Sequence, residues 1–273
     1  MAPMCGFATS RKASQMCRPK WIAFIGPAGV GKTYNLVEAV RDEVQTHPCK
    51  EFQTVLGLTF MHGARRRLHK RLALGLRSQA RVECSTIDSF ALGLVRRFRR
   101  HLGFHGLIFP DDSEDEWVER DRQHYGSFAI IRQAASHLIG IPEIRSSLSQ
   151  AYPILVVDEF QDCRDGLLVL VQALARSCNC FFAADEFQSL DDNPGGGVAW
   201  LESAAEVRRL EIQRRTQDSS LLSTAKALRS NVATPHGVDV ISPDGPGLAA
   251  WEVATRIVGG GVKVVENRRF EIP

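Results

Sequence analysis

The sequence predicts an α/β fold in which helices flank a parallel β-sheet. From residue 21 onwards, short apolar runs alternate with amphipathic segments of helical period, and this alternation is typical of strand–helix–strand units. The runs are apolar throughout, as expected for strands that are buried on both faces of a sheet. The predicted strands cover residues 21–25, 54–60, 81–86, 153–158 and 179–185.

Apolar residues spaced three and four apart predict the helices between these strands. The helix expected over residues 34–45 has one apolar face, formed by Leu36, Val37, Val40 and Val44. The helix after the third strand has an apolar side formed by Phe90, Leu94, Phe98 and Leu102. The helix before the last strand has one formed by Leu167, Leu168, Val171 and Leu174.

The composition is that of a soluble protein with a buried core. The chain has 273 residues, of which 44% are hydrophobic and 24% charged. This length fits one large domain with an insertion, or two modest domains, and the composition excludes a disordered, collagen-like or disulfide-stapled chain. No apolar run approaches the ~20 residues of a membrane-spanning helix, so we expect no membrane contact. Seven scattered cysteines without a CxxC pair argue against zinc and redox sites and favour a reducing, cytoplasmic location.

Charge is segregated along the chain, although the formal net charge is only +3. Residues 61–100 contain eleven Lys and Arg but two acids, whereas residues 111–122 contain seven acids and two arginines. These segments predict a basic face and an acidic stretch. Residues 1–20 are expected to form a basic, frayed tail.

A phosphate-binding motif follows the first predicted strand. Residues 26–33 read Gly-Pro-Ala-Gly-Val-Gly-Lys-Thr and match G-x-x-x-x-G-K-[ST] in full, between a strand and a helix as the motif requires. The loop's backbone N–H groups would surround phosphates, Lys32 would reach the β- and γ-phosphates, and Thr33 would offer its hydroxyl to Mg²⁺. The predicted nucleotide-binding residues are Gly26, Ala28, Gly29, Val30, Gly31, Lys32 and Thr33.

Two further predicted strands end in polar clusters. Residues 154–159 read Ile-Leu-Val-Val-Asp-Glu, so Asp158 is placed to hold Mg²⁺ through water and Glu159 to orient or deprotonate the attacking water. Residues 183–189 end in Asp-Glu-Phe-Gln-Ser, in which Gln188 would sense the γ-phosphate. Because ligands of α/β sheets bind at the carboxyl edge, we expect both clusters to face the phosphate loop.

These motifs, in this order, resemble the UvrD/Rep family of superfamily-one DNA helicases. The phosphate loop, Asp-Glu-Phe-Gln-Asp at 158–162 and Asp-x-x-Gln-Ser at 185–189 carry the resemblance. Residues 59–66, 86–90 and 210–216 resemble three further family segments, and the likeness spans roughly residues 21–230.

The resemblance implies a P-loop NTPase with a RecA-like ATP-binding domain over residues 21–230. That domain would have a small, mostly helical insertion at about 91–150, followed by a short extension over 231–273. The implied cofactors are ATP and Mg²⁺, the implied partner is single-stranded DNA, and the implied processes are DNA repair and recombination. The implied catalytic residues are Asp158, Glu159, Gln188 and Arg215, and the implied metal ligands are Thr33 and Asp158. The implied DNA contacts are Phe60, Arg65, Arg66 and Thr86. A solvated helix face is the structural alternative for the arginines, and a simple polar turn is the alternative for residues 183–189.

Several positions depart from the family pattern. Leu190 replaces an aromatic residue that supports DNA stacking, and whether Trp200 takes its place stays open. Asp88 replaces a histidine, and Arg214 replaces the tyrosine that stacks on adenine. The segment 191–197 is expected to be a loop.

Only 57 residues follow Thr216, whereas a second RecA-like lobe needs on the order of 100–150. We therefore expect the second motor lobe to be absent from this chain or supplied by a partner protein. Alone, the chain would bind ATP and DNA, hydrolyse ATP slowly and not unwind duplex DNA. An ATP-gated DNA-binding or regulatory module is the alternative. A third hypothesis is a small-molecule kinase, and the paired motifs at 158–162 and 185–189 argue against it.

Overall fold

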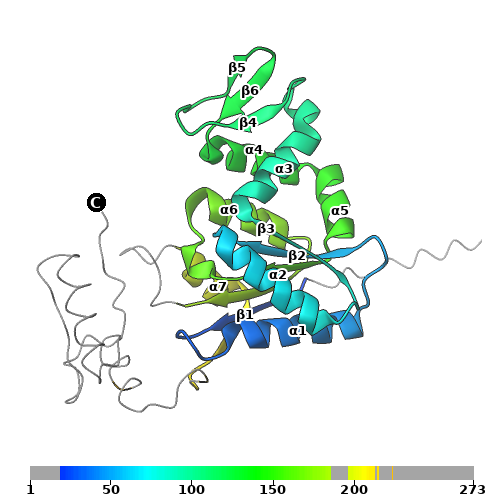
Figure 1. Ribbon diagram of the computed structural model, residues 1–273, viewed down its shortest axis with the longest axis vertical. Helices are drawn as coiled ribbons and strands as arrows, with labels where there is room; N and C mark the ends of the chain where they lie inside the picture. Colours follow the sequence, from blue (N-terminus) through cyan, green and yellow to red (C-terminus); the bar gives the residue numbers. More distant parts are fainter. Residues whose placement is uncertain (1–18, 186–195, 213, 215–222, 224–273) are drawn as a thin grey trace, which may run out of the picture. The chain divides into compact units, whose positions relative to one another are not determined.

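A parallel β-sheet forms the centre of the protein, as a computed structural model shows (Figure 1). The structure describes residues 19–185, 196–212, 214 and 223. Within these residues, the sheet has six strands in the order β3-β2-β7-β8-β1-β9, and every neighbouring pair is parallel. The strands are β1 (Trp21–Ile25), β2 (Thr54–Thr59), β3 (Arg81–Thr86), β7 (Ile154–Val157), β8 (Asn179–Ala184) and β9 (Glu206–Arg209).

The five predicted strands are confirmed, with ends that differ by at most one residue. Strand β9 was not predicted, because its residues Glu-Val-Arg-Arg lack an apolar run. Among the described residues, this strand pairs with β1 alone and lies at the edge of the sheet, where charged side chains can remain in solvent.

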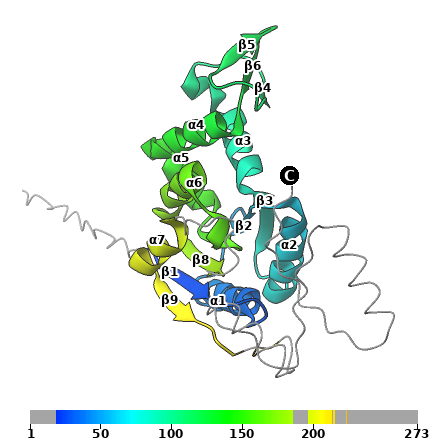
Figure 2. The ribbon, with the colours of Figure 1, turned by 90° about the vertical axis from the view of Figure 1, so that its left-hand side faces the viewer.

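Helices cover both faces of this sheet (Figure 2). Helices α1 (Lys32–Thr46) and α2 (His62–Leu76) lie on one face, and α6 (Asp165–Ala175) and α7 (Gly196–Ala204) lie on the other. Helix α3 (Ile87–Phe98) continues as the 3₁₀ turn η1 (Arg99–Leu102), so the helix predicted as far as Leu102 tightens in its last turn. The predicted α/β, RecA-like fold with a parallel sheet flanked by helices is confirmed.

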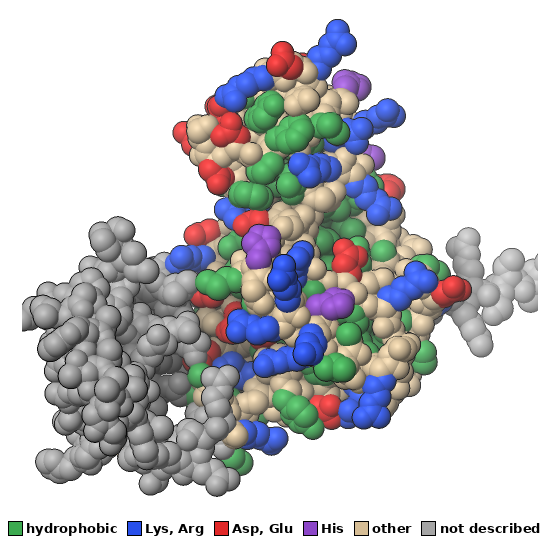
Figure 3. Space-filling model, viewed as in Figure 1, with side chains coloured by type: hydrophobic (Ala, Val, Ile, Leu, Met, Phe, Trp, Pro, Cys, Tyr) green, Lys and Arg blue, Asp and Glu red, His purple; other side chains and the backbone are tan. Residues whose placement is uncertain are grey.

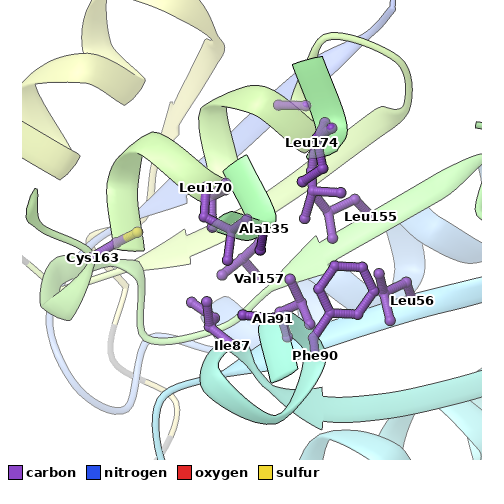
Figure 4. Close-up of a cluster of buried hydrophobic side chains, with 14 of the residues drawn as sticks. Leu56, Ile87, Phe90, Ala91, Ala135, Leu155, Val157, Cys163, Leu170 and Leu174 are labelled. Atoms are coloured by element: carbon purple, nitrogen blue, oxygen red, sulfur yellow. The ribbon is translucent and has the colours of Figure 1, made fainter. Parts of the chain in front are cut away.

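The core lies between the sheet and the helices α3, α4 (Phe128–Gly140) and α6 (Figure 4). Alternate strand residues point to this face, because successive side chains of a strand point to opposite sides. Fully burying one large aliphatic or aromatic side chain contributes about 1.5–3 kcal/mol. The side chains that meet here include Leu56, Leu155, Val157, Ile87, Phe90, Ala135, Leu170 and Leu174.

The segment between β3 and β7 holds more than the helices that were predicted for it. Besides α4 and α5 (Pro142–Ala151), it contains a second sheet of the described residues, in the order β4-β6-β5. Its strands are β4 (Ile108–Pro110), β5 (Val118–Arg120) and β6 (Gln123–Gly126). Strands of three or four residues give too little alternation for a sequence pattern, which is why they were missed.

The chain divides into two compact units. The first contains β1 and the residues from Lys32 to Arg209, and the second contains the loop Gly26–Gly31 with the residues from Leu210 onwards. The predicted tail up to residue 18 and the predicted extension 231–273 lie outside the described residues, and the predicted domain limits stay predictions. None of the helices in the described ranges has the length and apolar character needed to cross a membrane.

Replacing Gly57 by alanine tests how closely α2 packs on the sheet. A Cβ atom at Gly57 would lie 2.6 Å from Cys84 Sγ and 3.2 Å from Leu68 Cδ2, so neighbouring atoms must move. We expect Gly57→Ala to lower the free energy of unfolding by about 1–3 kcal/mol. Urea denaturation measures this change.

The matched control is Gly93→Ala in α3, where a Cβ atom meets nothing within 4 Å. Because alanine is the better helix former, this variant should be as stable as the parent or up to ~1 kcal/mol more stable. Equal effects of the two substitutions would contradict the close packing at Gly57.

Candidate functional site

The candidate site lies at the carboxyl edge of the parallel sheet. Val157 pairs with Phe182 and Ile25 pairs with Ala184, so β1, β7 and β8 end close together. Asp158 follows β7, Asp185 follows β8, and α1 begins with Lys32 and Thr33. The sheet therefore brings residues from three distant parts of the sequence to one place.

Lys32 is held by a buried carboxylate at this edge. Its Nζ lies 3.3 Å from Oδ2 of Asp185, and the two side chains are 12% and 2% exposed. A buried ammonium group next to the start of a helix attracts anions. A phosphate oxygen bound here would compete with Asp185 for the lysine.

Thr33 and Asp158 are within hydrogen-bonding distance of each other. The Thr33 hydroxyl donates to Oδ2 of Asp158 at 3.4 Å. Mg²⁺ takes oxygen ligands, commonly a carboxylate together with waters and phosphate oxygens. A hydroxyl and a carboxylate oxygen in contact fit that requirement, so these two residues are suited to hold Mg²⁺ with a nucleotide.

Asp158 is buried, and this burial raises the pKa of its carboxyl group to about 6. The neighbouring Glu159 charge raises the pKa further, while the hydrogen bond from the Glu159 N–H and the charges of Arg71 and Lys32 lower it. That N–H lies 3.1 Å from Oδ1 of Asp158. A divalent cation at this carboxylate would favour its ionised form.

Glu159 has an unusual backbone conformation. Its φ of 59° lies in the left-handed region, which costs a residue other than glycine on the order of 1–3 kcal/mol. Oε2 of this glutamate accepts a hydrogen bond of 2.8 Å from Nε2 of Gln161 in the turn η2 (Phe160–Asp162). Gln161 was not singled out from the sequence, although it lies within the 158–162 motif.

The loop Gly26–Gly31 has the backbone that the phosphate-binding motif requires. Gly29 and Gly31 both have φ of 88°, a backbone conformation that residues with a Cβ atom rarely adopt. A Cβ atom at Gly26 would lie 2.2 Å from the Leu210 carbonyl oxygen, and the Arg214 N–H donates to the Gly29 carbonyl at 3.0 Å. Two of the predicted catalytic residues, Gln188 and Arg215, lie outside the described residues, as does Leu190.

Trp200 is half-buried and packs on three aromatic rings. Its ring lies 5.8 Å from that of Phe160, 5.7 Å from that of Phe182 and 5.5 Å from that of Trp21, measured between centroids. This packing gives Trp200 a structural role between the sheet and η2.

Helix α7, which carries Trp200, begins at Gly196, so the loop predicted over 191–197 was wrong at its end. The cause is a close contact: a Cβ atom at Gly197 would lie 2.4 Å from the Cys163 carbonyl oxygen, and only glycine lets the helix approach η2.

The predicted DNA contacts lie at the same edge, beyond β2 and β3. Phe60 follows β2 and is half-buried against the core, whereas Arg66 on α2 is exposed and Arg65 is half-buried. Thr86 is buried and caps α3, because its Oγ1 accepts from the Ser89 N–H at 3.1 Å. A capping role accounts for this threonine without DNA.

Asp88, which replaces the family's histidine, has a cationic partner. Its Oδ1 lies 2.8 Å from Nη1 of Arg132 on α4. Arg132 of the inserted segment therefore neutralises the Asp88 carboxylate, which would otherwise repel a nearby phosphate.

Cations gather over α2, as the space-filling view shows (Figure 3). The helix contains no Asp or Glu. Its basic residues are Arg65, Arg66, Arg67, Lys70 and Arg71, and Arg77 follows at its end. This basic helix next to the site is suited to bind a phosphate backbone.

The family of the chain follows from a comparison of its sequence with family profiles. The profile of the AAA_19 family, described as an AAA domain, matches residues 10–193, which include the phosphate loop and both carboxylate motifs. The chain belongs to the AAA_19 family. Comparison with curated proteins finds no match.

Solved structures that match the chain include two Pif1 helicases. The Pif1 helicase from Candida albicans is 14% identical, with a TM-score of 0.44, and the match covers 88% of this chain and 51% of that one. The Bacteroides Pif1 helicase, solved with ADP-AlF3 and ssDNA, is 12% identical, with a TM-score of 0.38, and the match covers 91% and 55%. This AAA_19 chain thus spans about half the length of each helicase.

Replacing Asp158 by asparagine tests the raised pKa. Between about pH 4 and 6 the folded protein keeps a proton that the unfolded chain has released, so the free energy of unfolding falls as the pH rises through this window. Asparagine does not ionise. The free energy of unfolding of Asp158→Asn, minus that of the parent, should therefore be roughly 2–3 kcal/mol higher at about pH 7.5 than at about pH 4.

Urea denaturation in Mg²⁺-free buffer at both pH values measures this difference. A substitution effect that does not change with pH would show that Asp158 ionises normally in the folded protein.

Proposed function

We propose that this chain is the ATP-binding domain of a UvrD/Rep-type superfamily-one DNA helicase motor, which binds ATP–Mg²⁺ and single-stranded DNA and hydrolyses ATP. One observation carries the proposal: Lys32, Thr33 and the two carboxylates after β7 meet at the carboxyl edge of the sheet. Phosphoryl transfer needs a cation for the phosphates, a metal site and a group that positions water, and these residues supply one of each.

Each residue has a separate part in the proposed reaction. Lys32 would neutralise charge on the β- and γ-phosphates, while Thr33 and Asp158 would hold Mg²⁺, which would supply further positive charge for the phosphates. Glu159 orients the attacking water and accepts its proton. Gln188 and Arg215 keep their proposed parts, sensing the γ-phosphate and stabilising the charge that develops on it.

Single-stranded DNA would cross the same edge of the sheet. Phe60 offers an aromatic side chain on which a base can stack, and the basic α2 can follow the phosphate backbone. Of the two arginines that are predicted to contact DNA, Arg66 is the exposed one. Motion along DNA in such motors needs two lobes that close over ATP, so the proposal assigns unwinding to this domain together with a second lobe.

An ATP-gated DNA-binding module is the second candidate. The ion pair between Lys32 and Asp185 favours it, because a phosphate that binds Lys32 would release the end of β8. In that case nucleotide would change DNA affinity, while DNA would leave the rate of hydrolysis unchanged.

Steady-state ATP hydrolysis by the full chain, with and without single-stranded DNA, separates the two. The motor proposal predicts that DNA raises the turnover rate. Replacing Glu159 by glutamine should lower kcat by about 100-fold or more while ATP binding persists, because proton transfer to a positioned carboxylate contributes about 10²–10⁴-fold. Full turnover in Glu159→Gln would contradict the assigned chemistry.

Salt-dependent DNA binding tests the basic helix. Arg66→Ala should weaken binding to single-stranded DNA and reduce the slope of log K against log salt by about 0.7, because one phosphate contact is lost. Arg176→Ala, an equal loss of charge at an exposed residue of the opposite helical layer, is the control and should leave the slope unchanged. Equal slopes for both variants would remove α2 from the DNA path.

A further inference from the structure

Gln161 joins the ends of two strands within the candidate site. The residue lies in η2 and is only 6% exposed. Its Nε2 donates to Oε2 of Glu159 at 2.8 Å, and its Oε1 accepts from the backbone N–H of Asp185 at 3.0 Å. One side chain therefore contacts both the proposed water-activating carboxylate and the residue that follows β8.

The chemistry of these two bonds requires a carboxamide. An ionised carboxylate can only accept hydrogen bonds, and a backbone N–H can only donate. The side chain between them must donate at one end and accept at the other, as glutamine does. A carboxylate at position 161 keeps the acceptor but loses the donor, and an apolar side chain of similar size loses both.

Glu159 depends on such a contact for its orientation. Its backbone is held in the left-handed region, a state that persists only when the surrounding structure fixes it. The Glu159 N–H bonds to Oδ1 of Asp158, and the Glu159 carboxylate bonds to Gln161. Backbone and side chain are thus fixed by different partners.

We propose that Gln161 is a positioning residue for hydrolysis: it holds the Glu159 carboxylate towards the attacking water and ties that carboxylate to the end of β8. This inference rests on the proposed function, in which Glu159 activates water. Asp185 also binds Lys32, so the four residues Lys32, Asp185, Gln161 and Glu159 form a continuous chain of contacts. A phosphate that binds Lys32 would compete with Asp185, and Asp185 is the residue that Gln161 links to Glu159.

Two substitutions separate the ends of this link. Gln161→Met removes both hydrogen bonds with little change in volume, whereas Gln161→Glu keeps an acceptor for the Asp185 N–H. Both should lower kcat by about 10- to 100-fold, because a misplaced catalytic group costs rate rather than binding. The KM for ATP should stay within about threefold of the parent value. Gln172→Met on α6 is the matched control and should change neither constant.

A double-mutant cycle shows whether Gln161 acts through Glu159. In a Glu159→Gln background, Gln161→Met should cause no further loss of turnover. Equal losses in both backgrounds, or an unchanged kcat in both variants, would overturn the proposal. Full turnover in Glu159→Gln alone would instead refute the proposed role of Glu159.

Amide hydrogen exchange provides a readout that does not need activity. The Asp185 amide should exchange faster in Gln161→Met and stay protected in Gln161→Glu, because only the first removes its acceptor. Unchanged protection of Asp185 in Gln161→Met would show that the link to β8 does not exist, and the proposal would fail on that point.

Discussion

The parallel pairing of β7 with β8, and of β8 with β1, is the constraint on which the site depends. In a parallel sheet all strands end at the same edge, so residues that follow separate strands must lie close together. Asp158 and Asp185 are brought there by β7 and β8, while Lys32 and Thr33 arrive with α1. Burial at this edge also raises the pKa of Asp158 and strengthens each contact, since charges interact more strongly away from water.

Several features of the surrounding fold support this edge. Helix α7 reaches η2 because Gly197 has no side chain, and its Trp200 packs on Phe160, which precedes Gln161. The inserted segment contributes Arg132, which neutralises Asp88 at the start of α3. The packing of α7 and Trp200 supports the turn η2, which follows Glu159 and its left-handed backbone.

The sequence predicted those parts of the fold that depend on local pattern. Apolar runs located β1, β2, β3, β7 and β8, and Gln161 after β7 contacts Asp185, the one described residue of the motif after β8. Strand β9 and the small sheet were missed because edge pairing and very short strands leave no apolar run. Gln161 was missed because its two partners are set by the left-handed turn at Glu159, which residue types do not reveal. The capping of α3 by the Thr86 hydroxyl was missed because it becomes visible only when α3 begins at Ile87, and the DNA contact expected of Thr86 stays a prediction.

The most direct test of the account is a crystal structure of the full chain with Mg²⁺ and a non-hydrolysable ATP analogue. The account predicts that Lys32 leaves Asp185 for the β- and γ-phosphates. The metal would then lie beside Thr33 and Asp158, and the Glu159 carboxylate, still bonded to Gln161, would face a water in line with the γ-phosphate. A structure in which the nucleotide binds elsewhere, or in which Lys32 stays on Asp185 with the analogue bound, would contradict it.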